Sequence, residues 1–351
     1  MTIRRIGLVT HTGRAAARDA ADAVRAWARD HDVPFRDVDV WDKTGDGVPR
    51  RHARDEAEAG GHPDLIVTVG GDGTFLRGAR IAAHDDAAVL GINVGTLGFL
   101  TEVEPAGICG ALDIYHDGGA RIEERLTLTV RAARPLEVPA GIDALLRKGR
   151  GPTLPPPPPH RDQPGAAGSG IALDVVAVND VVFEKLVRDR QASLAVYLDG
   201  RLFASYSADA LVISTPTGST AYSFAAGGPV VSPRVDALVL TPVAPHMIFN
   251  RSLILAADEI VAIWVLEESG PIAVSIDGQL RGVLEPGDWM AVYKCERKAR
   301  MVRFQRADFF GRLRSRFGLA DAPATLPNRP LPAEYQPGAP VPGDIADLFR
   351  P

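Results

Sequence analysis

VTVGGDGTFLRGAR, residues 67–80, decides the fold: an apolar, β-branched run leads into a glycine-rich turn and then into a helix-like segment. Gly70, Gly71 and Gly73 allow a phosphate group to approach the backbone without a Cβ in the way. Asp72 places a carboxylate in the same turn, where it can bind Mg²⁺ or take a proton from an attacking hydroxyl. The alternative interpretation is a plain turn in which Asp72 caps the helix. The turn indicates phosphoryl transfer and leaves the acceptor open.

Strand and helix patterns alternate around this turn. Strands are expected at residues 6–10, 35–40, 64–69 and 88–93, and helices at 15–30 and 75–84. The alternation predicts an α/β domain over residues 1–122, a doubly wound parallel sheet with helices on both faces. Ligands bind such sheets outside the carboxyl ends of the strands, and Asp72 stands at one of those ends.

Beyond about residue 120 the pattern changes to regular short strands with little helix. This predicts a mostly antiparallel β domain over residues 123–304. Asp199-Gly200 between two apolar runs is a strong hairpin signal. The expected strands cover residues 126–131, 173–183, 192–198, 201–207, 210–214, 237–241, 259–266, 271–276 and 288–294. The last helix is expected at residues 307–317.

Two segments are expected to contribute nothing to chemistry. Residues 134–170 contain LPPPPPH and GAAGSG, which favour polyproline or flexible coil and predict a surface insertion at a strand connection. Recognition of the proline run by an SH3-type domain is the alternative. Residues 322–351 are again rich in proline and are expected to form a flexible tail.

Composition narrows the class of protein. The chain has 351 residues, enough for two domains with apolar cores, and its net charge of −5 gives no general attraction for nucleic acid or an anionic membrane. Cys109 and Cys295 form no CxxC pair and the eight histidines show no metal-ligand spacing, so a structural zinc site is not expected, and the residues that bind the divalent metal are left open. The first residues pass directly into a strand pattern, and no apolar run reaches the length of a membrane span. A cytoplasmic protein is expected.

A second stretch, ISTPTGSTAYSFAAGGPVVSP at residues 213–233, joins an apolar strand to small hydroxyl residues and another helix start. Like the first stretch, it places exposed backbone N–H groups at a strand-to-helix junction, where phosphate and nucleotide groups bind. The two junctions together predict a nucleotide site built from two parts of the chain.

Five motifs resemble those of the NAD kinase family, in the family's order. They are VNDVVFEK at 178–185, TPTGSTAY at 215–222, AAGGP at 225–229, APHMIFNRS at 244–252 and VSIDGQ at 274–279. Together with GGDGT they cover roughly residues 60–320, most of the chain. Diacylglycerol and sphingosine kinases are similar only at GGDGT, and 6-phosphofructokinases only at a related GGDG turn.

The resemblance implies transfer of a γ-phosphoryl group to the 2′-hydroxyl of the adenosine ribose of NAD, giving NADP. It implies ATP or polyphosphate as donor, Mg²⁺ or another divalent metal, and a homodimer or homotetramer. Asp72 is the implied catalytic residue, Asn179 and Asp180 the pair that holds the adenosine end, and Asp209 a residue near the nicotinamide side. The resemblance also implies that the last helix returns to the first domain, so that residues 305–321 belong to it.

The residues implied to bind ligand are Gly71, Asp72, Gly73, Arg77, Asn179, Asp180, Arg190, Asp209, Thr220, Ala221, Tyr222, Ser223, Phe224, Ala225 and Gln279. Within this set, Tyr222 offers a stacking face on the adenine side. Arg77 and Arg190 are the cations best placed for the anionic substrates.

Three positions depart from the family's pattern. Ala210 follows Asp209 where many members have glycine, so its Cβ is expected to crowd or shift a turn. Thr96 stands where many bacterial members have arginine, and Ser252 replaces the usual proline after Arg251. Because Asp72 is retained, catalysis is favoured over the alternatives, which are a non-catalytic NAD(P)-binding sensor and a lipid or small-molecule kinase that shares only GGDGT.

Overall fold

The computed structural model describes residues 2–11, 13–38, 56–58, 60–95, 98–139, 156–160, 169–187, 190–304, 309–319, 339–343 and 345. The chain divides into two compact units, Met1–Ala307 and Asp308–Pro351. The second unit contains helix α7 (Phe309–Arg316). That this helix returns to the first domain stays a prediction.

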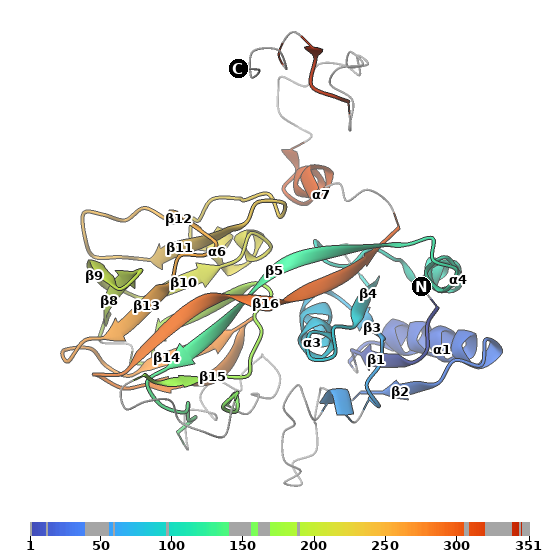
Figure 1. Ribbon diagram of the computed structural model, residues 1–351, viewed down its shortest axis with the longest axis horizontal. Coiled ribbons are helices and arrows are strands. Elements are labelled where there is room, and N and C mark those ends of the chain that lie inside the picture. Colours follow the sequence, from blue (N-terminus) through green and yellow to red (C-terminus); the bar gives the residue numbers. More distant parts are fainter. Residues whose placement is uncertain are drawn as a thin grey trace. The chain divides into compact units, whose positions relative to one another are not determined.

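The amino-terminal part is the expected parallel α/β arrangement. Four parallel strands lie in the order β2 (Phe35–Asp37), β1 (Ile6–Thr10), β3 (Leu65–Gly70) and β4 (Ala88–Asn93). They are connected by helices α1 (Ala15–Asp30) and α3 (Asp72–Ala82), and α4 (Ile108–His116) follows the short helix η1 (Pro105–Gly107). Figure 1 shows α3 on one side of these strands and α1 and α4 on the other.

Strand alternation explains the two layers of helices. Leu8, Val67 and Leu90 point to the face that packs against α1 and α4, and their neighbours Val9 and Ile66 point to the face that packs against α3. Successive residues of a strand face opposite sides, so strands buried on both faces need the continuous apolar runs seen here.

The second part packs two sheets face to face. Its six-stranded antiparallel sheet has the order β12 (Leu253–Ala256), β11 (Ala237–Val243), β10 (Ala210–Ser214), β7 (Asp180–Lys185), β14 (Ile272–Ile276) and β15 (Gln279–Leu284). Opposite it lie β13 (Val261–Val265), β8 (Ala192–Leu198) and β9 (Arg201–Ala208). A common core that includes Phe183, Ile213 and Ile263 draws residues from both sheets.

Two long strands tie the parts together. β16 (Trp289–Arg303) runs parallel to β4 near Arg300 and antiparallel to β13 near Val292, so the parallel strands and β13, β8 and β9 belong to one ten-stranded sheet. β5 (Arg121–Ala132) pairs along β16 and also with β6 (Ile171–Ala172). Both long strands are visible across the middle of Figure 1.

Several elements differ from the expected ranges. Residues 173–183 do not form one strand: β7 begins only at Asp180, and Leu173 and Ala177 form isolated bridges. Helix α4 and strands β12 and β15 were not predicted. The hairpin at Asp199-Gly200 is confirmed, because both residues have the positive φ angles, 47° and 75°, of a two-residue turn between β8 and β9.

The segment 134–170 lies mostly outside the described residues, as does the tail 322–351 apart from 339–343 and 345. The described piece 156–160 is hydrogen-bonded to the chain that follows β6. The N–H of His160 donates to the carbonyl of Ala172 (2.8 Å), and the N–H of Asp174 donates to the carbonyl of Pro158 (2.7 Å). Among the helices that the structure describes, none has the length and hydropathy needed to span a membrane.

Candidate functional site

The first strand-to-helix junction places Asp72 at the start of α3. Gly71 is the N-cap, so the interpretation of Asp72 as the cap residue is wrong. The Asp72 carboxylate instead accepts hydrogen bonds from the backbone N–H groups of Phe99 (2.9 Å) and Leu100 (3.1 Å). It lies so close to Gly98 that a Cβ there would stand 2.1 Å from Oδ1. The carboxylate is therefore oriented by the loop after β4.

Space is open above this turn. A Cβ added to Gly71 or Gly73 would meet nothing within 4 Å. The N–H of Thr74 already donates to the carbonyl of Gly71 (3.0 Å), which leaves those of Asp72 and Gly73 as the helix N-terminal donors that can meet an anion.

The second junction joins β10 to the short helices η2 (Gly218–Thr220) and α6 (Tyr222–Ala225). The Thr215 hydroxyl donates to the carbonyl of Val178 (2.6 Å) and accepts the N–H of Gly218 (3.0 Å). A Cβ on Gly218 would lie 2.0 Å from the carbonyl oxygen of Asn179, so only glycine allows this close approach. The turn is thus held against the start of β7.

A cavity of about 290 Å³, the Asp180 pocket, lies beside this junction. Its lining comes from β7, from the turn before α6 and from the β14–β15 hairpin. The lining residues are Asn179, Asp180, Val182, Glu184, Ala221, Tyr222, Ser275, Asp277 and Gly278.

A second cavity of about 110 Å³, the arginine pocket, lies between α3 and β15. It is lined by Gly73, Leu76, Arg77, Arg80, Val176, Ile276, Asp277, Gln279 and Arg281. Asp277 lines both cavities, so the two adjoin at this residue.

Asp277 is a site residue that the sequence reasoning missed. It has a φ of 48° and precedes Gly278, with φ 72°, in the turn between β14 and β15. Its carboxylate accepts the N–H groups of Asn179 (2.7 Å), Val178 (2.9 Å) and Asp180 (3.3 Å). The only sequence signal was the Asp-Gly dipeptide in VSIDGQ, which indicates a turn but not a contact with β7.

Two buried acids stand next to each other here. Burial, together with the neighbouring charge of Asp277, raises the pKa of Asp180 to about 7. Burial also raises the pKa of Asp277 to about 6, against the lowering effect of its three backbone hydrogen bonds. Asp180 is only 3% exposed, and among the described residues none hydrogen-bonds its carboxyl oxygens. Such a group is poised to accept hydrogen bonds from a ligand.

The structure gathers part of the expected ligand set. Asn179, Asp180, Ala221 and Tyr222 line the Asp180 pocket, and Gly73, Arg77 and Gln279 line the arginine pocket. The others line neither cavity: Gly71, Asp72, Arg190, Asp209, Thr220, Ser223, Phe224 and Ala225. Their role in binding stays a prediction.

Several of these residues have other neighbours. Asp209 forms an ion pair with the Lys185 ammonium group. The Ser223 hydroxyl is buried and shares a hydrogen bond with Thr241 (2.9 Å). Arg190 is exposed, and its side chain lies near Gly270.

A network of ion pairs and hydrogen bonds connects the two strand-to-helix junctions through β5 and β16. Glu123 pairs with Arg125 (2.9 Å) and with Arg303 (2.9 Å). Arg125 donates to the Thr217 hydroxyl (3.3 Å), and Arg303 donates to the carbonyl of Leu100 (2.9 Å), in the loop that binds the Asp72 carboxylate. Glu123 and Arg125 lie on β5 and Arg303 lies on β16, and no local sequence pattern indicates this network.

Comparison with known proteins settles the family. Residues 6–120 match the model of the ATP-NAD kinase N-terminal domain, and residues 178–304 match that of the C-terminal domain. NAD kinase 1 of Streptomyces coelicolor is 58% identical over 100% of this chain and 96% of its own length. NAD kinase 1 of Streptomyces avermitilis is 56% identical over 100% of this chain and 97% of its own. The chain belongs to the NAD kinase family.

Two solved structures share the fold of this chain. Yeast NADH kinase complexed with NADH has a TM-score of 0.66 at 20% identity and covers 94% of this chain and 91% of its own. The NAD kinase of Archaeoglobus fulgidus in complex with ATP has a TM-score of 0.59 at 20% identity and covers 90% and 96%. These likenesses confirm the expected combination of a parallel α/β part and an antiparallel β part.

Two departures from the NAD kinase pattern have a structural explanation. Ala210 lies in the regular strand β10, 1% exposed and without a positive φ, so the expected crowding of a turn does not occur. The Ser252 hydroxyl donates to Thr241 (3.2 Å) and extends the hydroxyl pair of Ser223. Thr96 lies outside the described residues.

Proposed function

We propose that this member of the NAD kinase family phosphorylates the 2′-hydroxyl of the adenosine ribose of NAD to give NADP, with ATP as donor. The observation that carries the proposal is the Asp180 pocket. It presents a buried carboxyl, to which none of the described residues donates a hydrogen bond, beside the amide of Asn179 and the aromatic ring of Tyr222. Ribose hydroxyls donate to such a carboxylate, and adenine stacks on such a ring.

Phosphoryl transfer requires mostly positioning and neutralisation of charge. We assign Asp72 to accept the proton of the 2′-hydroxyl, because its orientation is fixed by the N–H groups of Phe99 and Leu100. Gly73, one residue further, lines the arginine pocket, which adjoins the Asp180 pocket at Asp277. The Asp180 pocket, proposed for the acceptor ribose, therefore lies next to the cavity at the N-terminus of α3, where a phosphate group can bind.

The divalent metal belongs to the proposal. Among the residues that the structure describes, no group of three or more His, Cys, Asp or Glu side chains is arranged to hold a metal ion. This fits Mg²⁺ in kinases, which keeps several waters and is bound by one or two carboxylates together with substrate phosphates. Asp72 is the carboxylate available at the turn, and the bound metal would neutralise charge on the donor phosphates.

An incubation with ATP, Mg²⁺ and NAD tests the function, with NADP detected by an NADP-specific dehydrogenase. The expected result is NADP formation that requires all three components. Binding of NAD without turnover would contradict the proposal and indicate a sensor. Polyphosphate in place of ATP tests the alternative donor in the same assay.

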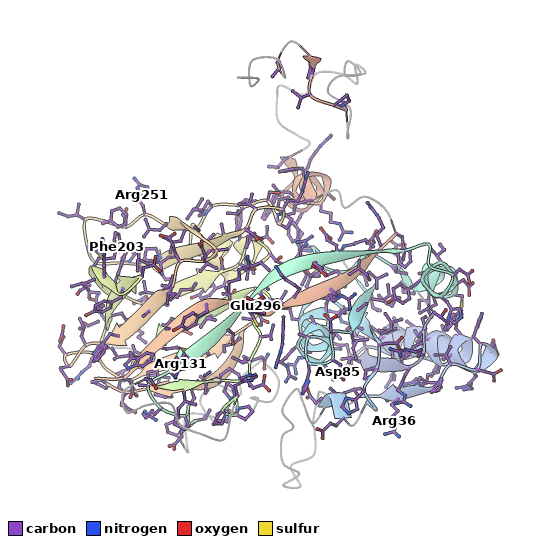
Figure 2. All side chains as sticks on the ribbon, in the orientation of Figure 1. Arg36, Asp85, Arg131, Phe203, Arg251 and Glu296 are labelled. Atoms are coloured by element: carbon purple, nitrogen blue, oxygen red, sulfur yellow. The ribbon has the colours of Figure 1, made fainter. Side chains whose placement is uncertain are left out.

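We also propose a homodimer or homotetramer. Phe203 and Phe249 contact each other edge to face, with ring centroids 5.7 Å apart, yet are 41% and 38% exposed, and Ile248 is fully exposed. Figure 2 labels Phe203 and Arg251 at the outer end of the β-rich part. Apolar groups exposed together favour an interface, and light scattering on the purified protein measures the assembly directly.

The proposed domain boundary lies at residues 122 and 123, between the two family matches at 6–120 and 178–304. We propose a cytoplasmic location, because Cys109 and Cys295 are both free thiols.

A further inference from the structure

Three arginine side chains line the arginine pocket. Arg77 and Arg80 lie three residues apart on one face of α3, and Arg281 faces them from β15. Their exposed fractions are 6%, 8% and 3%. Three guanidinium groups therefore share one small buried space.

Two acidic residues, Glu56 and Asp277, lie beside these arginines. Arg80 pairs with Glu56 (2.6 Å), which is also buried, and Asp277 uses its carboxylate to accept three backbone N–H groups. Within the described residues, Nε of Arg80 and Nε of Arg281 have no hydrogen-bond partner. Among the described residues, two buried guanidinium donors of the pocket therefore remain open.

Without a bound anion, this arrangement destabilises the folded protein. Burial, together with repulsion from Arg80, lowers the pKa of Arg281 to about 9 and that of Arg77 to about 10. Burying an unsatisfied donor or an excess charge destabilises a protein unless a ligand supplies the missing partner.

We propose that the arginine pocket is a phosphate-binding subsite in which Arg80 and Arg281 donate to the phosphate oxygens. A volume of about 110 Å³ suits a tetrahedral oxyanion and is too small for a nucleoside. The planar fork of arginine matches phosphate geometry, and Gly73 brings the N-terminus of α3 to the same cavity. The proposal rests on the proposed function only for the source of the phosphate, which is either the donor's chain or the pyrophosphate of NAD.

The variant Arg281→Met tests the subsite, with inorganic phosphate and tripolyphosphate as probes in low-chloride buffer. We expect calorimetry to show at least about a tenfold loss of affinity for both probes, the effect of removing one charged hydrogen bond. Thermal unfolding without ligand should give a melting temperature equal to or above that of the unsubstituted protein, because an uncompensated cation has been removed. Arg281→Lys keeps a charge but loses the fork, so its affinity should be intermediate.

Arg300→Met is the matched control, since Arg300 is also a strand arginine, and it pairs with Asp86 away from both cavities. It should keep the phosphate response. Unchanged phosphate affinity in Arg281→Met, or a markedly lower melting temperature without ligand, would overturn the proposal and make Arg281 a structural counter-ion.

Steady-state kinetics of Arg281→Met identify the source of the phosphate. A raised Michaelis constant for ATP alone assigns the subsite to the donor, and a raised constant for NAD alone assigns it to the acceptor's pyrophosphate. No change in either would contradict the proposal. If the unsubstituted protein binds phosphate through Arg281 but makes no NADP, the proposed function fails and the subsite stands.

Discussion

Replacing Asp180 by asparagine should stabilise the ligand-free protein at alkaline pH. The pKa of Asp180 rises from 3.8 to about 7 on folding, mainly through burial. The shift of about 3 units corresponds to roughly 4 kcal/mol, since each unit is about 1.4 kcal/mol. A carboxyl whose pKa is raised by folding contributes its stability fully below pH 3.8 and loses it as the pH rises through 7. Asparagine has nearly the same shape and does not titrate.

Urea unfolding of both proteins between pH 5 and pH 8 measures the effect. The free energy of unfolding of Asp180→Asn minus that of the unsubstituted protein should increase by about 2 to 3 kcal/mol over this range, the part of the total that falls within the window. The change with pH is the informative quantity, because it cancels any constant difference in packing. Glu184→Gln, which replaces an exposed acid of the same pocket, is the matched control. If the free energies of unfolding of Asp180→Asn and of the unsubstituted protein changed equally with pH, the raised pKa of Asp180 would not be a source of instability.

Three further predictions concern the steady-state kinetics. Asp72→Asn should lower kcat by about 100-fold or more and stability by about 1 kcal/mol, because asparagine keeps one acceptor for the two N–H groups of Phe99 and Leu100; near-normal kcat would remove Asp72 from catalysis. Gly98→Ala should reduce kcat much more than the melting temperature, because its Cβ would stand 2.1 Å from the Asp72 carboxylate; unchanged kcat would show that the carboxylate's position does not matter. The Michaelis constant for NAD should rise about tenfold from pH 8 to pH 6, as Asp180 with a pKa of about 7 becomes protonated; a flat profile would contradict its role as acceptor.

Local patterns predicted the helices and strands whose residues follow one hydrophobic period from end to end. Helix α1 and strands β1, β4 and β10 match the expected ranges at both ends. The missed strand β15 includes Arg281 and Gly282, which look unlike a buried strand. Gly282 is required because a Cβ would stand 2.5 Å from the Leu136 Cβ, a contact that no local pattern reveals.

The site residues also form two groups: those that a sequence motif reveals and those whose role depends on contacts with distant parts of the chain. The glycine turns, Asn179, Asp180 and Tyr222 lie in motifs, so a resemblance in sequence was enough to find them. Asp277 and Arg281 acquire their roles only from residues far away in the chain. Asp277 binds the backbone of 178–180, and Arg281 meets α3 across the arginine pocket. Long-range contacts of this kind are set by topology and leave no periodic trace in the sequence.

The central claim is that the pocket of Asp180 holds the acceptor ribose. Steady-state kinetics of Asp180→Ala, with each substrate varied in turn, test it most directly. We expect a rise of about tenfold or more in the Michaelis constant for NAD, the effect of removing a hydrogen bond to a charged group, and a nearly unchanged Michaelis constant for ATP. A rise for ATP alone would contradict the assignment of this pocket to NAD.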